Sequence, residues 1–280
     1  MWILVVTAGV LLVLATFGAR RQLDRRTDDR AWRELIAAPA VVHGTYEPAL
    51  VSGLPEAARR YFDYMIEPGT PLVTVVELRM VGDLGLGTQP SPRYRPMRAH
   101  QILAPPHGLV WRVVSGLLSG SDGALPNASW TRFRLAGLLP VVRAGGADHQ
   151  RSAFGRVVAE AAFWVPASLL PSEYVRWEST DDNRARAIMA YGQREQAVEI
   201  TVARDGAPAQ VLIQRWSNEN ADKVFRVQPF GGELYDFERF GGYRLPTRVE
   251  GGNHFGTDDY FPFFRADVTD IRFPGSTDAT

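Results

Sequence analysis

The sequence predicts an α+β protein in which an N-terminal transmembrane helix precedes a large antiparallel sheet. Three observations support this fold class. The first nineteen residues carry no charged side chain. From residue 72 onward, many segments alternate apolar and polar residues with a period of two, as strands do when one face of their sheet meets water. One helical segment, near residues 148–164, interrupts that series.

Length and composition limit the possible functions. The chain has 280 residues, zero net charge and no cysteine. The lack of cysteine excludes disulfides and thiolate nucleophiles, and zero net charge gives no electrostatic reason to expect nucleic acid as a partner. We expect a transmembrane anchor over residues 1–19, juxtamembrane helices and a connector over 20–70, and a single antiparallel sheet domain over 71–280.

The apolar N-terminal segment is long enough to cross a bilayer as a helix. No basic side chain precedes it, and the bulky Phe17 makes Phe17-Gly18-Ala19 a poor cleavage site for a signal peptide. These features predict a retained single-pass anchor in a bacterial cell membrane, with membrane lipids as its partners. Five arginines between residues 20 and 30 follow the segment. By the positive-inside rule they favour a cytoplasmic domain, but the pattern leaves the side of the membrane open.

Two helices and a series of strands are expected after the anchor. A helix over 28–39 is predicted, with Asp28 or Asp29 as its cap and Pro39 at its end, and a second amphipathic helix is predicted over 53–66. Asp205-Gly206 is a hairpin turn signal. The predicted strands are residues 72–80, 97–103, 108–116, 130–137, 174–180, 184–191, 197–206, 209–216, 233–240, 243–252 and 264–273.

No residue pattern in the chain identifies a reaction. The string GLLSGSDG at 116–123 lacks the spacing of a nucleophile elbow, and we interpret it as a Gly/Ser loop. The five histidines are scattered singly, and neither Asp181-Asp182-Asn183 nor Asp258-Asp259 has calcium-loop spacing. We therefore expect no catalytic residues, no cofactor and no metal site.

One charged pair lies in the otherwise apolar helical segment. Arg156 and Glu160 are four residues apart and face the same way on a helix. The favoured interpretation is a structural ion pair that braces this helix against the sheet. Inside a curved sheet the pair would be partly desolvated and would need further partners. A catalytic role for Glu160 is the alternative.

Residues 155–191, GRVVAEAAFWVPASLLPSEYVRWESTDDNRARAIMAY, resemble an uncharacterised bacterial membrane-protein family known only as a domain of unknown function. The pattern is an Arg, a Glu four residues later, Trp-x-Pro, a small-Leu-Leu stretch, Val-x-Trp-Glu and an acidic turn. The segments 53–64, 108–113 and 241–250 match as well. The order of elements is also similar to the LolA-like lipoprotein carriers, and that resemblance implies that the sheet is curved (a half-barrel), with helices packed on its concave face and an apolar cavity for acyl chains.

Three functions remain open from the sequence. The first is a non-enzymatic, membrane-anchored binding module for a lipid or another lipophilic ligand. The second is a structural or interaction subunit of a membrane complex with a filled core. The third is an unrecognised hydrolase that uses carboxylates such as Glu160, Asp181 or Glu178. We favour the first, and we predict that the ligand contacts Trp111, Phe133, Trp164 and Ile200.

Overall fold

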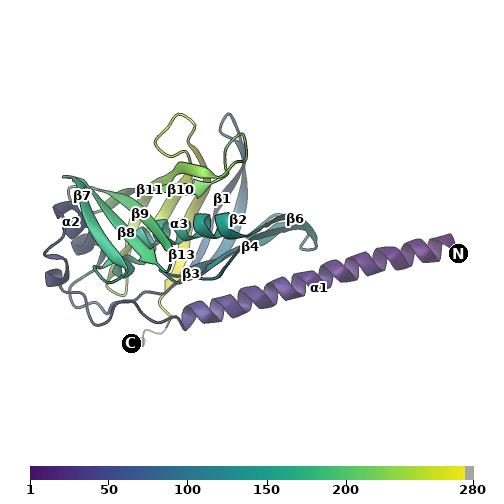
Figure 1. Ribbon diagram of the computed structural model, residues 1–280, viewed down its shortest axis with the longest axis horizontal. Helices are drawn as coiled ribbons and strands as arrows, with labels where there is room; N and C mark the ends of the chain where they lie inside the picture. Colours follow the sequence, from purple (N-terminus) through teal and green to yellow (C-terminus); the bar gives the residue numbers. More distant parts are fainter. Residues whose placement is uncertain (275–280) are drawn as a thin grey trace.

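The computed structural model describes residues 1–274, and its centre is one curved sheet of thirteen antiparallel strands (Figure 1). The chain enters at β1 in the middle of the sheet and runs outward through successive hairpins to β6 at one edge. Helix α3 then carries it to β7 at the opposite edge, and further hairpins return it to β13, which pairs with β1. The pairing of β1 with β13 therefore joins two meanders into a single sheet.

The helices and strands have the following bounds. The helices are α1 Trp2–Ile36, α2 Glu56–Met65 and α3 Ala147–Trp164, with short 3-10 turns at Pro48–Val51 and Pro166–Leu169. The first meander comprises β1 Val76–Thr88, β2 Ser91–Ala104, β3 Gly108–Ser115, β4 Leu118–Leu125, β5 Ala128–Leu135 and β6 Leu139–Ala144. The second comprises β7 Val175–Asp181, β8 Arg184–Tyr191, β9 Arg194–Val202, β10 Pro208–Ser217, β11 Arg226–Phe240, β12 Tyr243–Asn253 and β13 Phe261–Arg272.

The sequence missed two strands, β4 and β6, and the interpretation of residues 116–123 as a loop was wrong. Strand β4 contains two glycines because aromatic rings of the neighbouring strand β5 occupy the space beside them. A Cβ atom on Gly120 would lie 2.6 Å from the ring of Phe133, and one on Gly123 would lie 2.1 Å from the ring of Trp130. Small residues are therefore a packing requirement of this strand pair, even though their composition is typical of loops.

Helix α3 crosses the concave face of the sheet, as expected, and most of its side chains are buried. Val157, Val158 and Ala161 are fully buried among apolar side chains of the sheet. Helix α2 packs into the same core, and its Tyr61 hydroxyl donates a hydrogen bond of 2.9 Å to the carbonyl of Ala162. A helix that is enclosed by a curved sheet is apolar on most of its surface. This explains why the sequence of α3 shows little amphipathic pattern.

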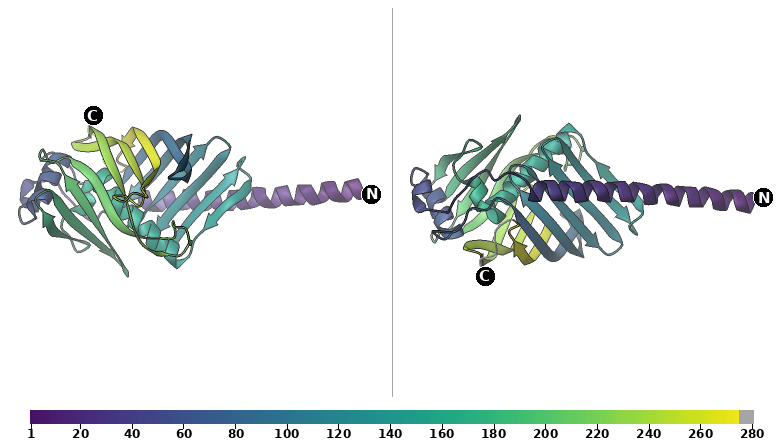
Figure 2. Two further views of the ribbon diagram at one scale, coloured as in Figure 1. Left: turned by 90° about the horizontal axis from the view of Figure 1, so that it is seen from above. Right: turned by 90° about the horizontal axis from the view of Figure 1, so that it is seen from below.

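The N-terminal segment forms one continuous helix, so the predicted second helix start at Asp28 or Asp29 was wrong. Helix α1 runs for 35 residues without a break and ends before Pro39. Its apolar first half is largely exposed and projects beyond the sheet, while its second half lies along the convex face (Figure 2). The expected boundary between residues 19 and 20 falls inside this helix.

Apolar contacts hold the last two turns of α1 on the convex face. Ala31, Trp32 and Leu35 are buried against side chains of β2, β3 and β5 that point away from the concave core. The guanidinium of Arg112 lies over the ring of Trp32, and its Cζ atom is 4.9 Å from the centre of that ring. The members of this second core on the sheet side are Val75, Ile102, Ala104, Val110 and Trp130.

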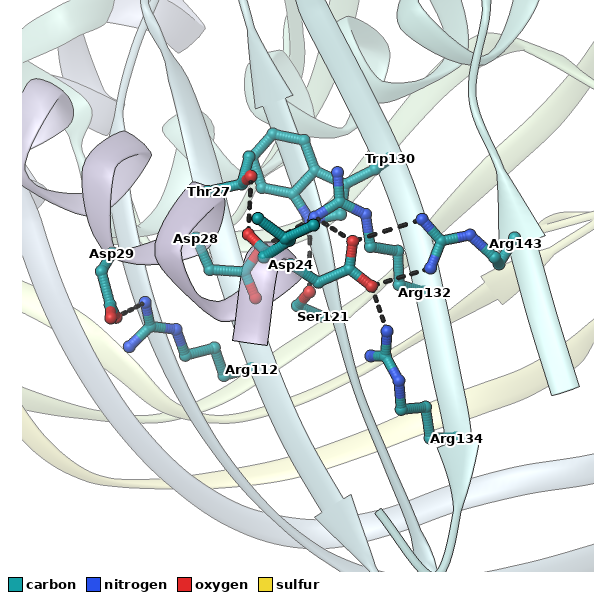
Figure 3. Close-up of polar contacts among 11 residues, drawn as sticks. Asp24, Thr27, Asp28, Asp29, Arg112, Ser121, Trp130, Arg132, Arg134 and Arg143 are labelled. Carbon is teal, nitrogen blue, oxygen red and sulfur yellow. Dashed lines mark hydrogen bonds and ion pairs between the residues drawn. The ribbon is translucent and has the colours of Figure 1, made fainter. Parts of the chain in front are cut away.

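Ion pairs extend this contact toward the apolar half of the helix (Figure 3). Asp24 binds three arginines of the sheet: Arg134, Arg143 at 2.7 Å and Arg132 at 3.4 Å. Its hydrogen bond raises the pKa of the Arg143 guanidinium. Asp28, one turn later, lies 3.5 Å from Arg132. Three aspartates of α1, namely Asp24, Asp28 and Asp29, therefore bind arginines of the sheet.

We predict that the double substitution Asp24→Ala, Asp28→Ala loosens the second half of α1 from the sheet. Each charge-assisted hydrogen bond lost stabilises the docked helix by about 1.5–3 kcal/mol. Trypsin should therefore cut faster at the arginines between residues 20 and 33. The matched control is Glu34→Ala, since Glu34 is exposed on the same helix and forms no ion pair among the described residues. Equal cleavage rates for the double variant and the control would contradict the docking role.

Candidate functional site

A cavity of about 540 Å³ lies between α3 and the concave face of the sheet. Its wall comes from α3 and from eight strands of both meanders, and it combines aromatic and aliphatic side chains with a few charged groups. Trp111 and Trp164 are buried at its inner end, whereas Leu86 and Glu219 are exposed at its rim. The cavity is therefore a cleft open at one end, and its volume is within the range of about 300–1,000 Å³ that is typical of ligand pockets.

Glycines on the strands form part of the wall of this cavity. Gly232 and Gly85 both line it, and both lie too close to a neighbouring strand to carry a side chain. A Cβ atom on Gly232 would lie 1.9 Å from the carbonyl oxygen of Glu250, and one on Gly85 would lie 2.8 Å from the Cα of Phe263. Gly251 is different, because a Cβ atom there would meet only the carbonyl oxygen of Gly231, at 3.5 Å.

Three of the four residues predicted to contact a ligand line this cavity: Trp111, Phe133 and Trp164. Ile200 does not line it. Its side chain is fully buried in the concave core on β9, a strand that α3 covers closely. The indole N–H of Trp111 is buried and has no acceptor among the described residues, whereas that of Trp164 donates to the carbonyl of Pro246 at 3.4 Å.

The structure places Arg156 and Glu160 in contact at the inner end of the cavity, within a larger polar network. Arg156 Nε lies 2.6 Å from Glu160 Oε1, and its Nη1 lies 3.0 Å from Asp122 Oδ2 on β4. Its Nη2 donates to Gln101 Oε1 at 3.3 Å, and the Gln101 amide in turn donates to Glu160. Burial opposes the charge of Arg156, but the two carboxylates outweigh it and raise the pKa of the guanidinium.

The partners Asp122 and Gln101 were not found from the sequence. Asp122 lies in the glycine-rich segment that was interpreted as a loop, and Gln101 lies in a strand whose alternation does not single it out. The one available signal was the need of a desolvated ion pair for further hydrogen bonds. The network closes the inner end of the cavity with groups that are already bonded to one another.

A second cavity of about 280 Å³ adjoins the first. Asp122, Thr131, Arg156, Arg215 and Glu219 line both cavities. The wall of the smaller cavity also includes hydroxyl, amide and imidazole groups. One is His149, whose ring contacts the hydroxyls of Ser129 at 2.8 Å and Thr131 at 3.0 Å, and whose pKa is lowered by burial. The larger cavity therefore has a mainly apolar wall, and the smaller cavity beside it has a wall with more polar groups.

The carboxylates considered for a hydrolase do not come together. Glu178 and Asp181 lie on β7 and bind neighbouring arginines at the surface, with Asp181 at 2.7 Å from Arg184. Neither lines the cavity that contains Glu160. Within residues 1–274, no three His, Cys, Asp or Glu side chains form a group suited to a metal ion. The aromatic and aliphatic wall of the larger cavity is suited to holding an apolar or amphipathic molecule.

The network predicts unequal effects for its two principal charges. Arg156→Met removes the cation that is bonded to both Glu160 and Asp122 and should cost about 3–5 kcal/mol of unfolding free energy. Glu160→Gln should cost less, because Arg156 keeps Asp122 as a partner. Urea unfolding of the detergent-solubilised chain measures both. Equal losses in both variants would contradict this network.

The chain matches a family model and is similar to several solved structures. The model of the family DUF6544, described as a family of unknown function, matches residues 44–266. No significant match is found among curated proteins. Similar solved structures include a LolA superfamily protein from Nitrosomonas europaea (TM-score 0.42, 10% identity, covering 78% of this chain and 91% of that one) and a putative outer membrane lipoprotein-sorting protein domain from Vibrio parahaemolyticus (0.37, 11%, 73% and 87%). A third is a DUF1329 family protein from Desulfovibrio piger (0.42, 9%, 73% and 88%). Since the family model spans most of the chain, this protein belongs to the DUF6544 family.

Proposed function

We propose that this protein is a membrane-anchored, non-enzymatic binding module that holds a lipid or another lipophilic ligand in the concave cavity. The observation that carries the proposal is the open cavity of about 540 Å³ with aromatic and aliphatic walls. Trp111, Phe133 and Trp164 are the proposed ligand contacts, because they line the cavity on three different elements. Binding a hydrocarbon chain against such a wall removes apolar surface of both partners from water, which favours the complex.

The form of α1 supports the proposed anchor. The first half of the helix is apolar and exposed, and it meets the length and hydropathy expected of a membrane-crossing helix, which a signal sequence also meets. The second half is docked on the sheet, and no break separates the two halves. A cleavage after residue 19 would cut inside this helix. A retained anchor would thus hold the sheet domain at a fixed orientation to the membrane surface.

We predict that Gly251→Leu fills the cavity and reduces the amount of bound lipid without destabilising the fold. The new side chain has room there, since its Cβ meets only one backbone oxygen at ordinary contact distance. Mass spectrometry of organic extracts from the purified full-length chain measures bound lipid per chain. The control is Val114→Phe, which adds bulk at an exposed position on the convex side of β3.

Two results would contradict the lipid-binding proposal. If the unmodified chain repeatedly carries no lipid, the alternative of a structural subunit gains support. If Gly251→Leu lowers the free energy of unfolding by about 1–3 kcal/mol, the site behaves as a filled core that is overpacked by the new side chain. A loss of lipid with unchanged stability supports the proposal.

The anchor prediction is that residues 1–19 remain attached and span the membrane. N-terminal sequencing of the mature protein should therefore start at residue 1 or 2, and a start near residue 20 would refute it. The five arginines after the span favour a cytoplasmic domain. A reporter enzyme fused after residue 280 should accordingly be active in the cytoplasm, and activity only outside the membrane would reverse that orientation.

A further inference from the structure

Arg215, on β10, lies where the two cavities meet, and it differs from the other arginine of the site. Its Nε donates to the hydroxyl of Ser152 at 3.1 Å and to the carbonyl of the same residue at 3.3 Å. Its guanidinium carbon lies 4.6 Å from the centre of the Phe230 ring. Within residues 1–274 it forms no ion pair, and no carboxylate lies within 4.0 Å of it.

Three carboxylates interact electrostatically with Arg215, but each of them is bonded to another residue. Asp122 binds Arg156 and the Thr131 hydroxyl, and Glu160 binds Arg156 and the Gln101 amide. Glu219, at the rim, binds Lys223 at 3.2 Å. The terminal nitrogens of Arg215 are therefore without a partner among the described residues, while Arg215 itself lines both cavities.

These nitrogens are accessible from the cavity space. The sealed side-chain polar atoms without a hydrogen bond in the described residues belong to Arg60, Trp111 and Tyr260, and those of Arg215 are not among them. Burial lowers the pKa of Arg215 to about 10, and repulsion by Arg156 adds to that effect. The side chain is thus still cationic at neutral pH. A buried cation without an anionic partner is unfavourable, and an acidic group placed beside it would offset part of that cost.

We propose that Arg215 binds the acidic group of an amphiphilic ligand, a carboxylate or a phosphate, whose hydrocarbon part occupies the larger cavity. The proposal rests on the lipid-binding function proposed above and names the headgroup chemistry for that site. A guanidinium presents two parallel N–H donors that match either acid. The aromatic and aliphatic wall of the larger cavity begins directly beside it, with Phe230 at the junction. Arg156 and Arg215 balance Asp122 and Glu160 in charge, and the two further carboxylates on the wall, Glu219 and Glu250, are paired with Lys223 and Arg265.

The test compares two probes with the same hydrocarbon tail. The full-length chain, freed of detergent in an amphipathic polymer, is titrated with the fluorescent fatty acid cis-parinaric acid and with its uncharged methyl ester. Arg215→Gln removes the cation. Arg194→Gln is the matched control, because Arg194 also lies over an aromatic ring, that of Phe154 at 5.1 Å, and also has its pKa lowered by burial, yet lines neither cavity.

The expected result is that the unmodified chain binds the acid at least tenfold more tightly than the ester. Arg215→Gln should weaken binding of the acid by roughly tenfold to a hundredfold, the range expected for a hydrogen bond to a charged group, and should leave the ester unchanged. Arg194→Gln should change neither. Arg215→Lys, which keeps the charge and loses the paired donors, should fall between the unmodified chain and Arg215→Gln. Competition by oleic acid and by lysophosphatidic acid then decides between a carboxylate and a phosphate.

Several outcomes would overturn the proposal. Equal affinity of the unmodified chain for acid and ester would mean that only the tail is bound, which leaves the lipid-binding function intact and removes the role of Arg215. Loss of both probes in Arg215→Gln would make Arg215 a structural residue. Displacement of parinaric acid by inorganic phosphate alone would indicate a site for free phosphate. If the unmodified chain binds neither probe, the proposed function fails together with this inference. The comparison of acid with ester in the unmodified chain stands even if Arg215→Gln does not fold.

Discussion

The buried guanidinium of Arg156 is the interaction on which the interior of this protein depends. Arg156 lies on α3 and binds Glu160 of the same helix. It also binds Asp122 on β4 and Gln101 on β2, and these two contacts link α3 to the first meander. A charge placed inside a curved sheet needs such partners, because the loss of its hydration would otherwise oppose folding. Since α3 also joins the two meanders, the same contact fixes how the helix lies across the concave face. The space left beside it is the cavity.

The concave face of the sheet lines the cavities and the convex face binds α1, and the strand pair β4–β5 contributes side chains to both faces. Successive side chains of a strand point to opposite faces. Thr131 and Phe133 therefore line the cavities, while Arg132 and Arg134 bind Asp24 of α1 on the convex side. The wall of the proposed ligand site and the docking surface of α1 are thus built from alternate residues of one strand. Helix α1 and the cavity are held at a fixed separation by that geometry.

Much of the architecture was predictable from the sequence, because alternating strands, an apolar terminus and helical spacing are local features. Eleven of the strands and helix α2 follow from such patterns. Strand β4 could not be predicted in this way, because its glycines are required by the rings of Trp130 and Phe133, which occupy the space beside them. Likewise Asp28 and Asp29 resemble helix caps, but lie inside a continuous helix. In both places a contact with a distant segment outweighs the local preference.

The sequence by itself determined the fold class, the apolar N-terminal helix, the family pattern around Arg156 and Glu160, and the absence of cysteine chemistry. Only the tertiary structure decided that α1 docks on the convex face and that Asp122 and Gln101 complete the ionic network. It placed Arg215 between two cavities, where it has no ion pair within residues 1–274. It also decided that Ile200 belongs to the packed core while Trp111, Phe133 and Trp164 border the open space. The reason is physical: periodicity reports which face of an element is buried, whereas an empty volume or an unpaired charge depends on the side chains that several distant elements bring to one place.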